Sequence, residues 1–279
     1  MELRDDQIER YARHIILKEV GGVGQSRLLN ARVLVIGAGG LGSPIIMYLA
    51  AAGIGTIGAV DFDEVSLSNL QRQIVHTTER VGMPKTASAA KAVAALNPDV
   101  RLVQHTERLT ATNAMQLVSQ YDIVADGSDN FATRFLVNDA CFFAKKTLVS
   151  GALSQFDGQI ATFKPYQAGE HPCYRCIYRE PPPPGLAPSC AEAGILGALA
   201  GVVGSLQATE VLKEVVGIGE SLSGKLVIYD ALHAAWRTVR VRRDAKCALC
   251  GTVPTIKDLS QSLIGHAQPG EEFCEVPAA

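Results

Sequence analysis

Gly37-Ala38-Gly39-Gly40-Leu41-Gly42 is the stretch that decides the fold of this 279-residue chain. It follows the apolar run Val33–Ile36 and opens a segment of helical character over Gly42–Ala52. A strand, a glycine-rich turn and a helix in this order are typical of dinucleotide-binding motifs, in which phosphate binds at the helix N-terminus. Asp61 ends the next apolar run, at the place where an acid binds a ribose hydroxyl in such motifs. The sequence therefore predicts a nucleotide site; the plainer alternative is that these glycines only serve a tight turn.

Polar residues that follow this acid favour a triphosphate over a hydride carrier. The string Ser68-Asn69-Leu70-Gln71-Arg72-Gln73 comes soon after Asp61, and Lys85 follows twelve residues later. Cations close to a ribose site suit a polyphosphate, whose charge is spread over several oxygens. Arg13, in the polar N-terminal segment, completes the candidate set. Because any one of these side chains is more often a solvated surface residue, the prediction depends on the set.

Apolar runs alternate with amphipathic helices along the first half of the chain. The expected strands there are Val33–Ile36, Thr56–Asp61, Leu102–Thr106, Asp122–Ala125 and Thr147–Gly151. The expected helices are Gly42–Ala52, Lys85–Leu96, Thr112–Gln120 and Asn130–Ala144, followed later by a long apolar helix over Ile195–Val216. Further strands, antiparallel to one another, are expected at Gln159–Lys164, Leu226–Tyr229 and Thr238–Arg242. This pattern predicts an α/β fold, a Rossmann-like doubly wound sheet whose parallel N-terminal half continues into antiparallel strands.

The segment Asp126-Gly127-Ser128-Asp129-Asn130 follows another predicted strand. Carboxylates at such a strand end can hold Mg²⁺, and Asp129 is the candidate ligand. The alternative is helix capping, with Ser128 or Asp129 as the N-cap of the helix that follows. Both interpretations can hold, because the segment offers two carboxylates and a cap needs one.

The chain has seven cysteines, and four of them form two Cys-x-x-Cys pairs. The pairs are Cys173 with Cys176 and Cys247 with Cys250. Two such pairs predict a structural zinc site with four thiolate ligands, which ties the segment near residue 173 to a later part of the chain. A redox function is the alternative, but two redox pairs in one chain are less expected.

Two other cysteines have separate interpretations. Cys190 follows a proline-rich loop and precedes the long helix, where a thiol can have a lowered pKa and act as a nucleophile. A small buried apolar residue is an equal alternative for Cys190. Cys141 lies in an apolar helix and is expected in the core.

Composition excludes several classes of partner. The net charge of −2 gives no electrostatic reason to expect nucleic acid. Glycines and Pro44 interrupt the uncharged stretch Val33–Val60, and Ala193–Thr209 is shorter than a membrane span, so no membrane partner is expected. Met1–Glu9 is polar and acidic, unlike a secretory signal, and the odd cysteine count argues against a disulfide framework. We therefore expect a cytoplasmic protein.

These motifs together resemble the MoeB/ThiF family, the bacterial relatives of ubiquitin-activating enzymes, over nearly all of the chain except its tail. The strings that carry the resemblance are Arg10 to Ile16, Gly37 to Gly42, Asp61 to Asp63, Ser68 to Gln73, Gly82 to Lys85, Asp126 to Asn130, both cysteine pairs and Cys190. The resemblance implies an adenylyltransferase that uses ATP, Mg²⁺ and Zn²⁺. The substrate would be the C-terminal Gly-Gly carboxylate of a ubiquitin-like sulfur-carrier protein. The likeness is nearest to the molybdopterin-synthase branch, whose carrier is the small subunit of molybdopterin synthase.

The resemblance also implies a role for individual residues. The implied nucleotide-binding residues are Gly37, Gly39, Gly40, Gly42, Asp61, Asp63, Ser68, Asn69, Leu70, Gln71, Arg72, Lys85, Asp129 and Asn130. Within this set, Asp61 would hold the ribose, Asn69, Arg72 and Lys85 the phosphates, and Asp129 the Mg²⁺. Arg13 would come from the other subunit of a homodimer. Cys190 matches a position that is a nucleophile in some members and dispensable in others.

The resemblance predicts one adenylation domain over residues 1–250. It would consist of N-terminal helices over 1–30, a nucleotide-binding half over 31–151, and a carrier-binding and zinc-bearing half over 152–250. Residues 251–279 are expected to form a tail too short for a rhodanese domain. Sulfur would then come from a separate donor, such as a cysteine desulfurase or a rhodanese.

Three alternatives remain open at this stage. A thiamine-pathway adenylyltransferase would transfer sulfur covalently through Cys190. An NAD(P)-binding oxidoreductase would explain the glycine loop but not Arg72, Lys85 or the cysteine pairs. A zinc-containing adaptor without activity would not need the full set of phosphate-binding residues.

Overall fold

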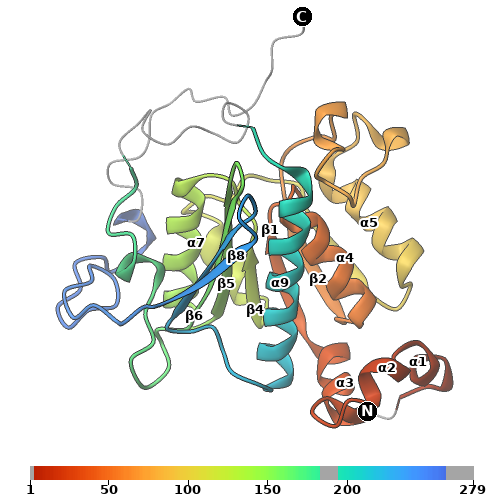
Figure 1. The fold of residues 1–279 in the computed structure, drawn as a ribbon, viewed down its shortest axis with the longest axis horizontal. Coiled ribbons are helices and arrows are strands. Elements are labelled where there is room, and N and C mark those ends of the chain that lie inside the picture. The colour runs from red at the N-terminus through yellow and green to blue at the C-terminus, as the bar shows by residue number, and fades with distance from the viewer. Residues whose placement is uncertain (1–2, 183–193, 262–279) are drawn as a thin grey trace, which may run out of the picture.

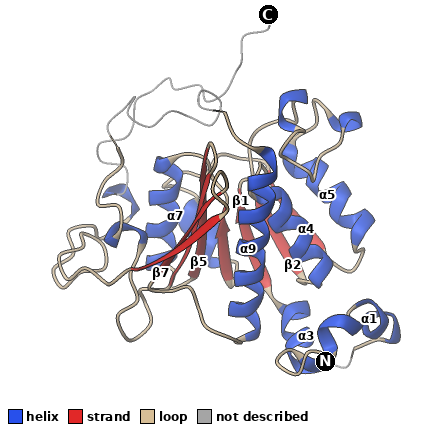
Figure 2. Cartoon of the chain, viewed as in Figure 1, coloured by secondary structure: helices blue, strands red, loops and turns tan. Residues whose placement is uncertain are grey.

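An eight-stranded sheet runs through the molecule, and helices lie on both of its faces (Figure 1). The computed structural model describes residues 3–182 and 194–261. The strands are β1 (Arg32–Ile36), β2 (Thr56–Val60), β3 (Arg101–His105), β4 (Ile123–Asp126), β5 (Thr147–Ser154), β6 (Asp157–Phe163), β7 (Lys225–Asp230) and β8 (Ala235–Arg240). Their order across the sheet is β3-β2-β1-β4-β5-β6-β7-β8. β1 to β5 pair in parallel and β6 to β8 join antiparallel, so the predicted change of direction is confirmed (Figure 2).

Two helical layers bury the apolar strands. The helices are α1 (Asp5–Arg10), α2 (Ala12–Ile15), α3 (Gly21–Asn30), α4 (Gly42–Ala52), α5 (Lys85–Leu96), α6 (Ala114–Ser119), α7 (Phe131–Phe143) and α9 (Gly197–Val216). Val33 and Val35 of β1 belong to the core shared with α4, α5 and α9, whereas Leu34 and Ile36 belong to the core shared with α6 and α7. Burial of both faces explains why β1 is a continuous apolar run instead of an alternating one. Cys141 on α7 is 2% exposed, as expected of a core residue.

The element boundaries differ from the predicted ones by a few residues at several ends. The fifth strand continues beyond Gly151 to Ser154, because it pairs with β6 along its whole length. The last strand begins at Ala235, where it pairs with Asp230, and not at Thr238. The long apolar helix begins at Gly197. Neither it nor any other helix in the described ranges is long and apolar enough to cross a bilayer.

The order of the strands creates a topological switch point between β1 and β4. β1 lies between β2 on one side and β4 on the other, so the connections that leave β1 and β4 diverge to opposite sides. In open parallel sheets, ligands bind at such a switch point, beyond the carboxyl ends of the strands. The glycine-rich stretch follows β1 here, and the segment Asp126 to Asn130 begins at the end of β4.

The chain stays packed after the second cysteine pair. A short 3-10 helix over Leu259–Gln261 contacts α7, and Leu259 is only 6% exposed in the core beneath that helix. The beginning of the segment that the sequence pattern assigns to a tail is therefore part of the fold.

Candidate functional site

The glycine loop is a tight turn whose first and last positions accommodate only glycine. Gly37 has a positive φ of 85° and donates its N–H to the carbonyl of Val60. A Cβ on Gly42 would lie 1.8 Å from the carbonyl oxygen of Gly37. Side chains at these positions would open the turn, so the glycines bring the start of α4 close to the end of β1.

Asp61 holds this loop from the end of β2. Its Oδ2 accepts the N–H of Ala38 at 2.8 Å, and its Oδ1 accepts the N–H of Asp63 at 2.9 Å. Burial raises the pKa of Asp61, while the positive charge of Lys85 opposes that rise. Each carboxylate oxygen keeps acceptor capacity for a ligand hydroxyl, because a carboxylate has about four lone-pair sites.

Lys85 places a buried cation at the same carboxyl ends of the strands. It is the first residue of α5, and its side chain is 7% exposed. Its Nζ lies 2.7 Å from Oδ2 of Asp63, whose side chain is 45% exposed. The half-exposed carboxylate therefore holds the ammonium group at the mouth of the site.

The segment that follows Asp63 folds back over the glycine loop. A 3-10 helix over Leu67–Asn69 begins it, and the Asn69 side chain accepts the N–H of Ser66 at 3.2 Å. Arg72 lays its aliphatic carbons against the position of Gly40 and donates to the carbonyl of Ser68 at 3.2 Å. The predicted residues Ser68, Asn69, Leu70, Gln71 and Arg72 thus lie on one loop beside the glycines, with Gln71 against the start of α9.

Two further residues of this region were not predicted. His76, 5% exposed, bonds through Nε2 to the carbonyl of Ala38 at 3.0 Å and through Nδ1 to the hydroxyl of Ser88 at 2.9 Å. A carbonyl only accepts, so Nε2 carries the proton and Ser88 donates to Nδ1. Burial lowers the pKa of His76 to about 4. Gln73 is also buried and lies near Gly39; its place in the string Ser68 to Gln73 was the available signal.

The loop after β4 lies against the glycine loop. A Cβ on Gly37 would come within 3.2 Å of the carbonyl oxygen of Gly127. Asn130 caps α7 by accepting the N–H of Thr133 at 2.8 Å, so the predicted caps Ser128 and Asp129 are wrong. Asn130 is better placed because it immediately precedes the first helical residue, whereas Asp129 is exposed. Capping therefore leaves the Asp129 carboxylate available for a cation.

Arg13 lies far from these residues within its own chain. It belongs to α2, whose N-cap residue Tyr11 accepts a hydrogen bond from Asn97, in the turn between α5 and the start of β3. The glycine loop lies at the carboxyl ends of the strands, and a five-residue strand such as β1 is roughly 16 Å long. Figure 1 shows α1, α2 and α3 beyond the opposite edge of the sheet. The other predicted cations, Arg72 and Lys85, lie at the carboxyl edge.

The two cysteine pairs meet in space. The sulfur atoms of Cys173, Cys176, Cys247 and Cys250 all lie within 4.8 Å of one another. The Sγ–Sγ distances include 3.9 Å within the first pair and 3.5 and 3.4 Å between the pairs. A tetrahedral zinc site with Zn–S bonds of about 2.3 Å has sulfur–sulfur edges of roughly 3.8 Å. The four sulfurs are therefore gathered closely enough to hold a zinc ion between them.

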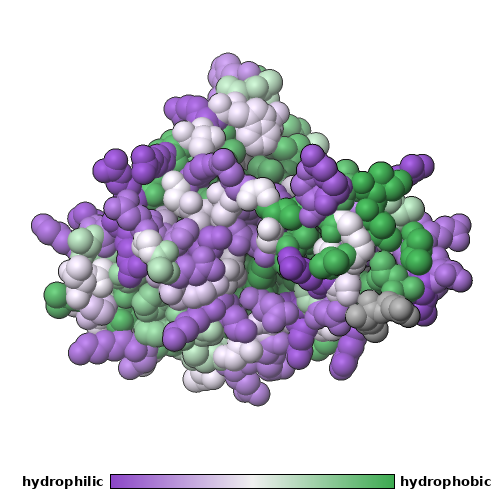
Figure 3. All heavy atoms as spheres, turned by 90° about the horizontal axis from the view of Figure 1, so that it is seen from below, coloured by the Kyte–Doolittle hydropathy of each residue, from purple (hydrophilic) through white to green (hydrophobic). Residues whose placement is uncertain are grey.

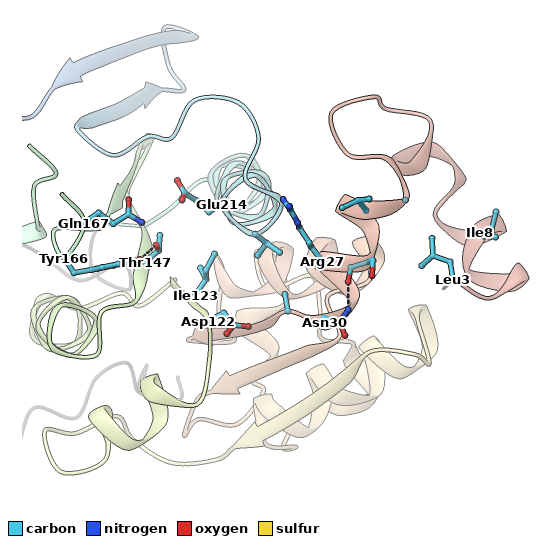
Figure 4. A pocket seen from close by; sticks show the side chains of 15 residues that line it. Leu3, Ile8, Arg27, Asn30, Asp122, Ile123, Thr147, Tyr166, Gln167 and Glu214 are labelled. Carbon is cyan, nitrogen blue, oxygen red and sulfur yellow. Dashed lines mark hydrogen bonds between the residues drawn. The ribbon is translucent and has the colours of Figure 1, made fainter. Parts of the chain in front are cut away.

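A groove of about 1250 Å³ lies at the edge of the sheet opposite the glycine loop (Figure 4). Arg27 and Asn30 of α3, Glu214 of α9 and Thr147 at the start of β5 line it. The residues of this groove include none of the predicted site residues. The loop geometry, and not the size of this groove, therefore locates the candidate site at the carboxyl ends of β1, β2 and β4. Cys190 lies outside the described residues.

The fold and the site define an α/β nucleotide-binding protein with a four-cysteine cluster. Residues 11–249 match the ThiF family. The chain is 52% identical over 261 residues to the sulfur carrier protein adenylyltransferase of Thermus thermophilus, covering 93% of this chain and 96% of that protein. It is 48% identical to the probable adenylyltransferase/sulfurtransferase MoeZ of Mycobacterium tuberculosis, covering 99% of this chain and 67% of that protein. This chain belongs to the ThiF family.

Solved structures support the same fold at lower identity. The crystal structure of E. coli MccB with ATP superposes with a TM-score of 0.74 at 23% identity. The match covers 87% of this chain and 73% of that one. At this identity the likeness shows the shared fold.

Proposed function

We propose that the protein activates a sulfur-carrier protein by adenylation. The carrier's C-terminal carboxylate would attack the α-phosphate of ATP, which gives an acyl-adenylate and releases pyrophosphate. The observation that carries this proposal is the gathering of Asp61, Arg72 and Lys85 around the glycine loop. An acid for the ribose and cations for the phosphates match a triphosphate, and the names of the relatives match the reaction.

Each residue of the site has one task in this proposal. N–H groups of the glycine loop and the start of α4 face the phosphates, and Asp61 accepts a ribose hydroxyl. Arg72, Lys85 and Asn69 bind the phosphate oxygens, where negative charge develops as pyrophosphate leaves. Asp129, exposed beside the glycine loop, would hold Mg²⁺, which supplies further charge neutralisation on the phosphates.

Carrier-dependent exchange of pyrophosphate into ATP tests the reaction. We expect exchange only when a carrier that ends in Gly-Gly is present, and we expect Mg²⁺-ATP to raise the melting temperature more than NAD⁺ does. Loss of exchange in Arg72→Ala with an unchanged melting temperature would support the assignment of the phosphate contacts. Exchange without a carrier, or stabilisation by NAD⁺ alone, would contradict the proposal.

We assign the carrier to the molybdopterin-synthase type. The assignment rests on the resemblance of the motifs, and a thiamine-type carrier is the alternative. Exchange measured with the two purified carriers side by side distinguishes them.

We further propose that a separate donor supplies the sulfur. Four of the cysteines gather in one cluster that fits zinc, and this is consistent with action in the reducing cytoplasm.

We propose that the active protein is a homodimer in which Arg13 enters the partner's nucleotide site. The distance between Arg13 and the glycine loop of its own chain supports a contribution across an interface. Apolar side chains are exposed on the same N-terminal helices and their connection, with Ile16, Leu17 and Val23 between 51% and 72% exposed. Figure 3, which views the molecule from below, shows an apolar patch at the end of the molecule where these helices lie. A second copy that covers this patch would bury it.

Subunit mixing tests this arrangement. Inactive Arg13→Ala and Lys85→Ala chains, once exchanged into a hetero-dimer, should recover activity, because one of the two sites then carries both residues. We expect roughly one quarter of the wild-type activity after random exchange, since half of the dimers then contain one intact site. Failure to recover after demonstrated exchange would show that Arg13 acts in its own chain.

A further inference from the structure

Two peptide groups of the glycine loop are anchored by their carbonyl oxygens. The carbonyl of Ala38 accepts a hydrogen bond from Nε2 of His76 at 3.0 Å. The carbonyl of Gly39 accepts the backbone N–H and the hydroxyl of Ser43, at 2.9 and 2.7 Å. Because the peptide groups here are trans, each carbonyl points away from the N–H of its own peptide group. The N–H groups of Gly39 and Gly40 are therefore directed away from these anchors.

These two N–H groups are available to a ligand. Neither donates to a backbone carbonyl in the described parts of the chain. Gly39 and Gly40 are half-buried, whereas Ala38, whose carbonyl His76 holds, is fully buried. The turn leads into α4, and N–H groups at the start of a helix favour an anion. The orientation of these peptide groups therefore decides how well the turn binds phosphate.

His76 is held between the glycine loop and α5. It is 5% exposed, and its Nδ1 lies 2.9 Å from the hydroxyl of Ser88, which is 0% exposed. Ser88 lies one turn after Lys85 on α5, and α5 packs beside α4 (Figure 1). The carbonyl of Ala38 requires a proton on Nε2, and the Ser88 hydroxyl then donates to the unprotonated Nδ1. Ser88 thus keeps the ring in the tautomer and orientation that bind Ala38.

The same peptide chain is fixed from a second side by the acid at the end of β2. Asp61 accepts the N–H of Ala38 through Oδ2 at 2.8 Å and the N–H of Asp63 through Oδ1 at 2.9 Å. Asp63 in turn accepts Nζ of Lys85, at 2.7 Å, on the helix that the histidine contacts. A ring of hydrogen bonds therefore joins the glycine loop, α5 and the expected ribose acid, and the histidine is one of its links.

We propose that His76 is a positioning residue that aims the N–H of Gly39 at the phosphates of the nucleotide. Its Nε2 holds the Ala38 carbonyl on the buried side, so the N–H of the same peptide group points to the opposite side. The histidine then contributes to the affinity for ATP without touching the nucleotide. The inference rests on the proposed adenylation, which supplies the nucleotide.

Two amide variants separate this role from ordinary packing. Counted in bonds from Cα, the amide nitrogen of glutamine stands where Nε2 stands in histidine, and that of asparagine stands where Nδ1 does. His76→Gln can therefore still donate to Ala38, whereas His76→Asn is too short. We expect His76→Asn to weaken the binding of Mg²⁺-ATP about tenfold, the effect of losing one hydrogen bond to a charged group. His76→Gln should stay within about threefold of the wild-type affinity.

Adenosine is the second probe, because it has the base and the ribose but no phosphate. Its affinity should be the same in both variants and the wild-type protein, whereas a general loosening of the site would weaken adenosine as well. Gln25→Met is the matched control, because Gln25 is 0% exposed and donates to the carbonyl of Ala52, at 2.9 Å, at the other end of α4. It loses a buried hydrogen bond of the same kind and should leave the ratio of the ATP and adenosine affinities unchanged. Thermal melting checks that each variant is folded.

The outcomes separate the two proposals. Wild-type ATP affinity in His76→Asn, or an equal weakening of ATP and adenosine, overturns the positioning role, and so does a His76→Gln variant as weak as His76→Asn. Absence of carrier-dependent exchange in the wild-type protein overturns the proposed adenylation instead, and the ratio of affinities still tests His76. Wild-type protein that binds ATP no more tightly than adenosine overturns both.

A measurement on the wild-type protein decides the question if His76→Asn does not fold. The amide NMR signal of Gly39 should shift when Mg²⁺-ATP is added and stay in place with adenosine. A signal that responds equally to the two probes, or to neither, overturns the positioning role.

Discussion

Replacing Lys85 with alanine should remove one phosphate contact and disturb the acid that holds the ribose. The Lys85 ammonium group lies 2.7 Å from Asp63, and its positive charge opposes the rise in pKa that burial causes at Asp61. A charge-assisted hydrogen bond contributes about 1.5–3 kcal/mol, which corresponds to roughly 10- to 100-fold in rate. We therefore expect carrier-dependent pyrophosphate exchange to fall by that factor.

Stability should change little in the same variant. The partner carboxylate of Asp63 is half exposed, and such an ion pair contributes about 0–1 kcal/mol. For a chain of this size that is a shift in melting temperature of roughly 2–4 °C or less. The exchange rate per folded molecule therefore reports the loss of the contact.

The pH dependence gives an independent check. Without Lys85 the pKa of Asp61 rises further, because burial raises it and the opposing positive charge is gone. The ionised acid is then lost at a higher pH as the solution is acidified, so the acidic limb of the exchange profile should move to higher pH. Lys91→Ala, an exposed lysine of the same helix, is the matched control. Exchange within twofold of wild type, or an equal loss in the control, would refute the reasoning.

The remaining predictions concern three other side chains. The pKa of His76 is lowered to about 4 from 6.5, so the unfolded chain takes up a proton that the native protein does not. The free energy of unfolding should therefore be unaffected by this group above pH 6.5 and fall toward pH 4, by at most about 3 kcal/mol. The urea midpoint of His76→Gln should fall less steeply with decreasing pH than that of the wild-type protein. Equal slopes for the two proteins would contradict this. One zinc per chain is expected, and Cys173→Ser should lower the melting temperature more than it lowers exchange per folded molecule; zinc-free protein after reducing purification would count against the site. Cys190→Ala should keep both exchange and thiocarboxylate formation if the enzyme only adenylates, whereas a reductant-sensitive carrier adduct that this variant lacks would show covalent transfer.

Local signals in the chain were sufficient for the class of fold. The glycines at 37 and 42 indicate a turn in which a side chain would collide with the backbone, and part of this steric requirement comes from residues close by in the sequence. Alternating apolar strands and amphipathic helices similarly report burial, so the parallel half and its antiparallel continuation were predictable. Asp61, Arg72 and Lys85 were predicted as one group because they follow the glycine loop closely in the chain, and the structure places them beside that loop. His76 was missed because its contact with Ala38 leaves no periodic trace in the sequence.

The sequence by itself determined the glycine turn, the strand–helix alternation and the two cysteine pairs, because each depends on residues close together in the chain. Tertiary structure alone decided which distant segments meet. It joined cysteines 74 residues apart into one cluster, and it placed β4 beside β1, so that Asp126 to Asn130 lie against the glycine loop. It also set Arg13 at the opposite edge and made Asn130 the helix cap. Strand order and helix docking follow from burying both faces of one sheet, a global packing requirement that no local pattern encodes.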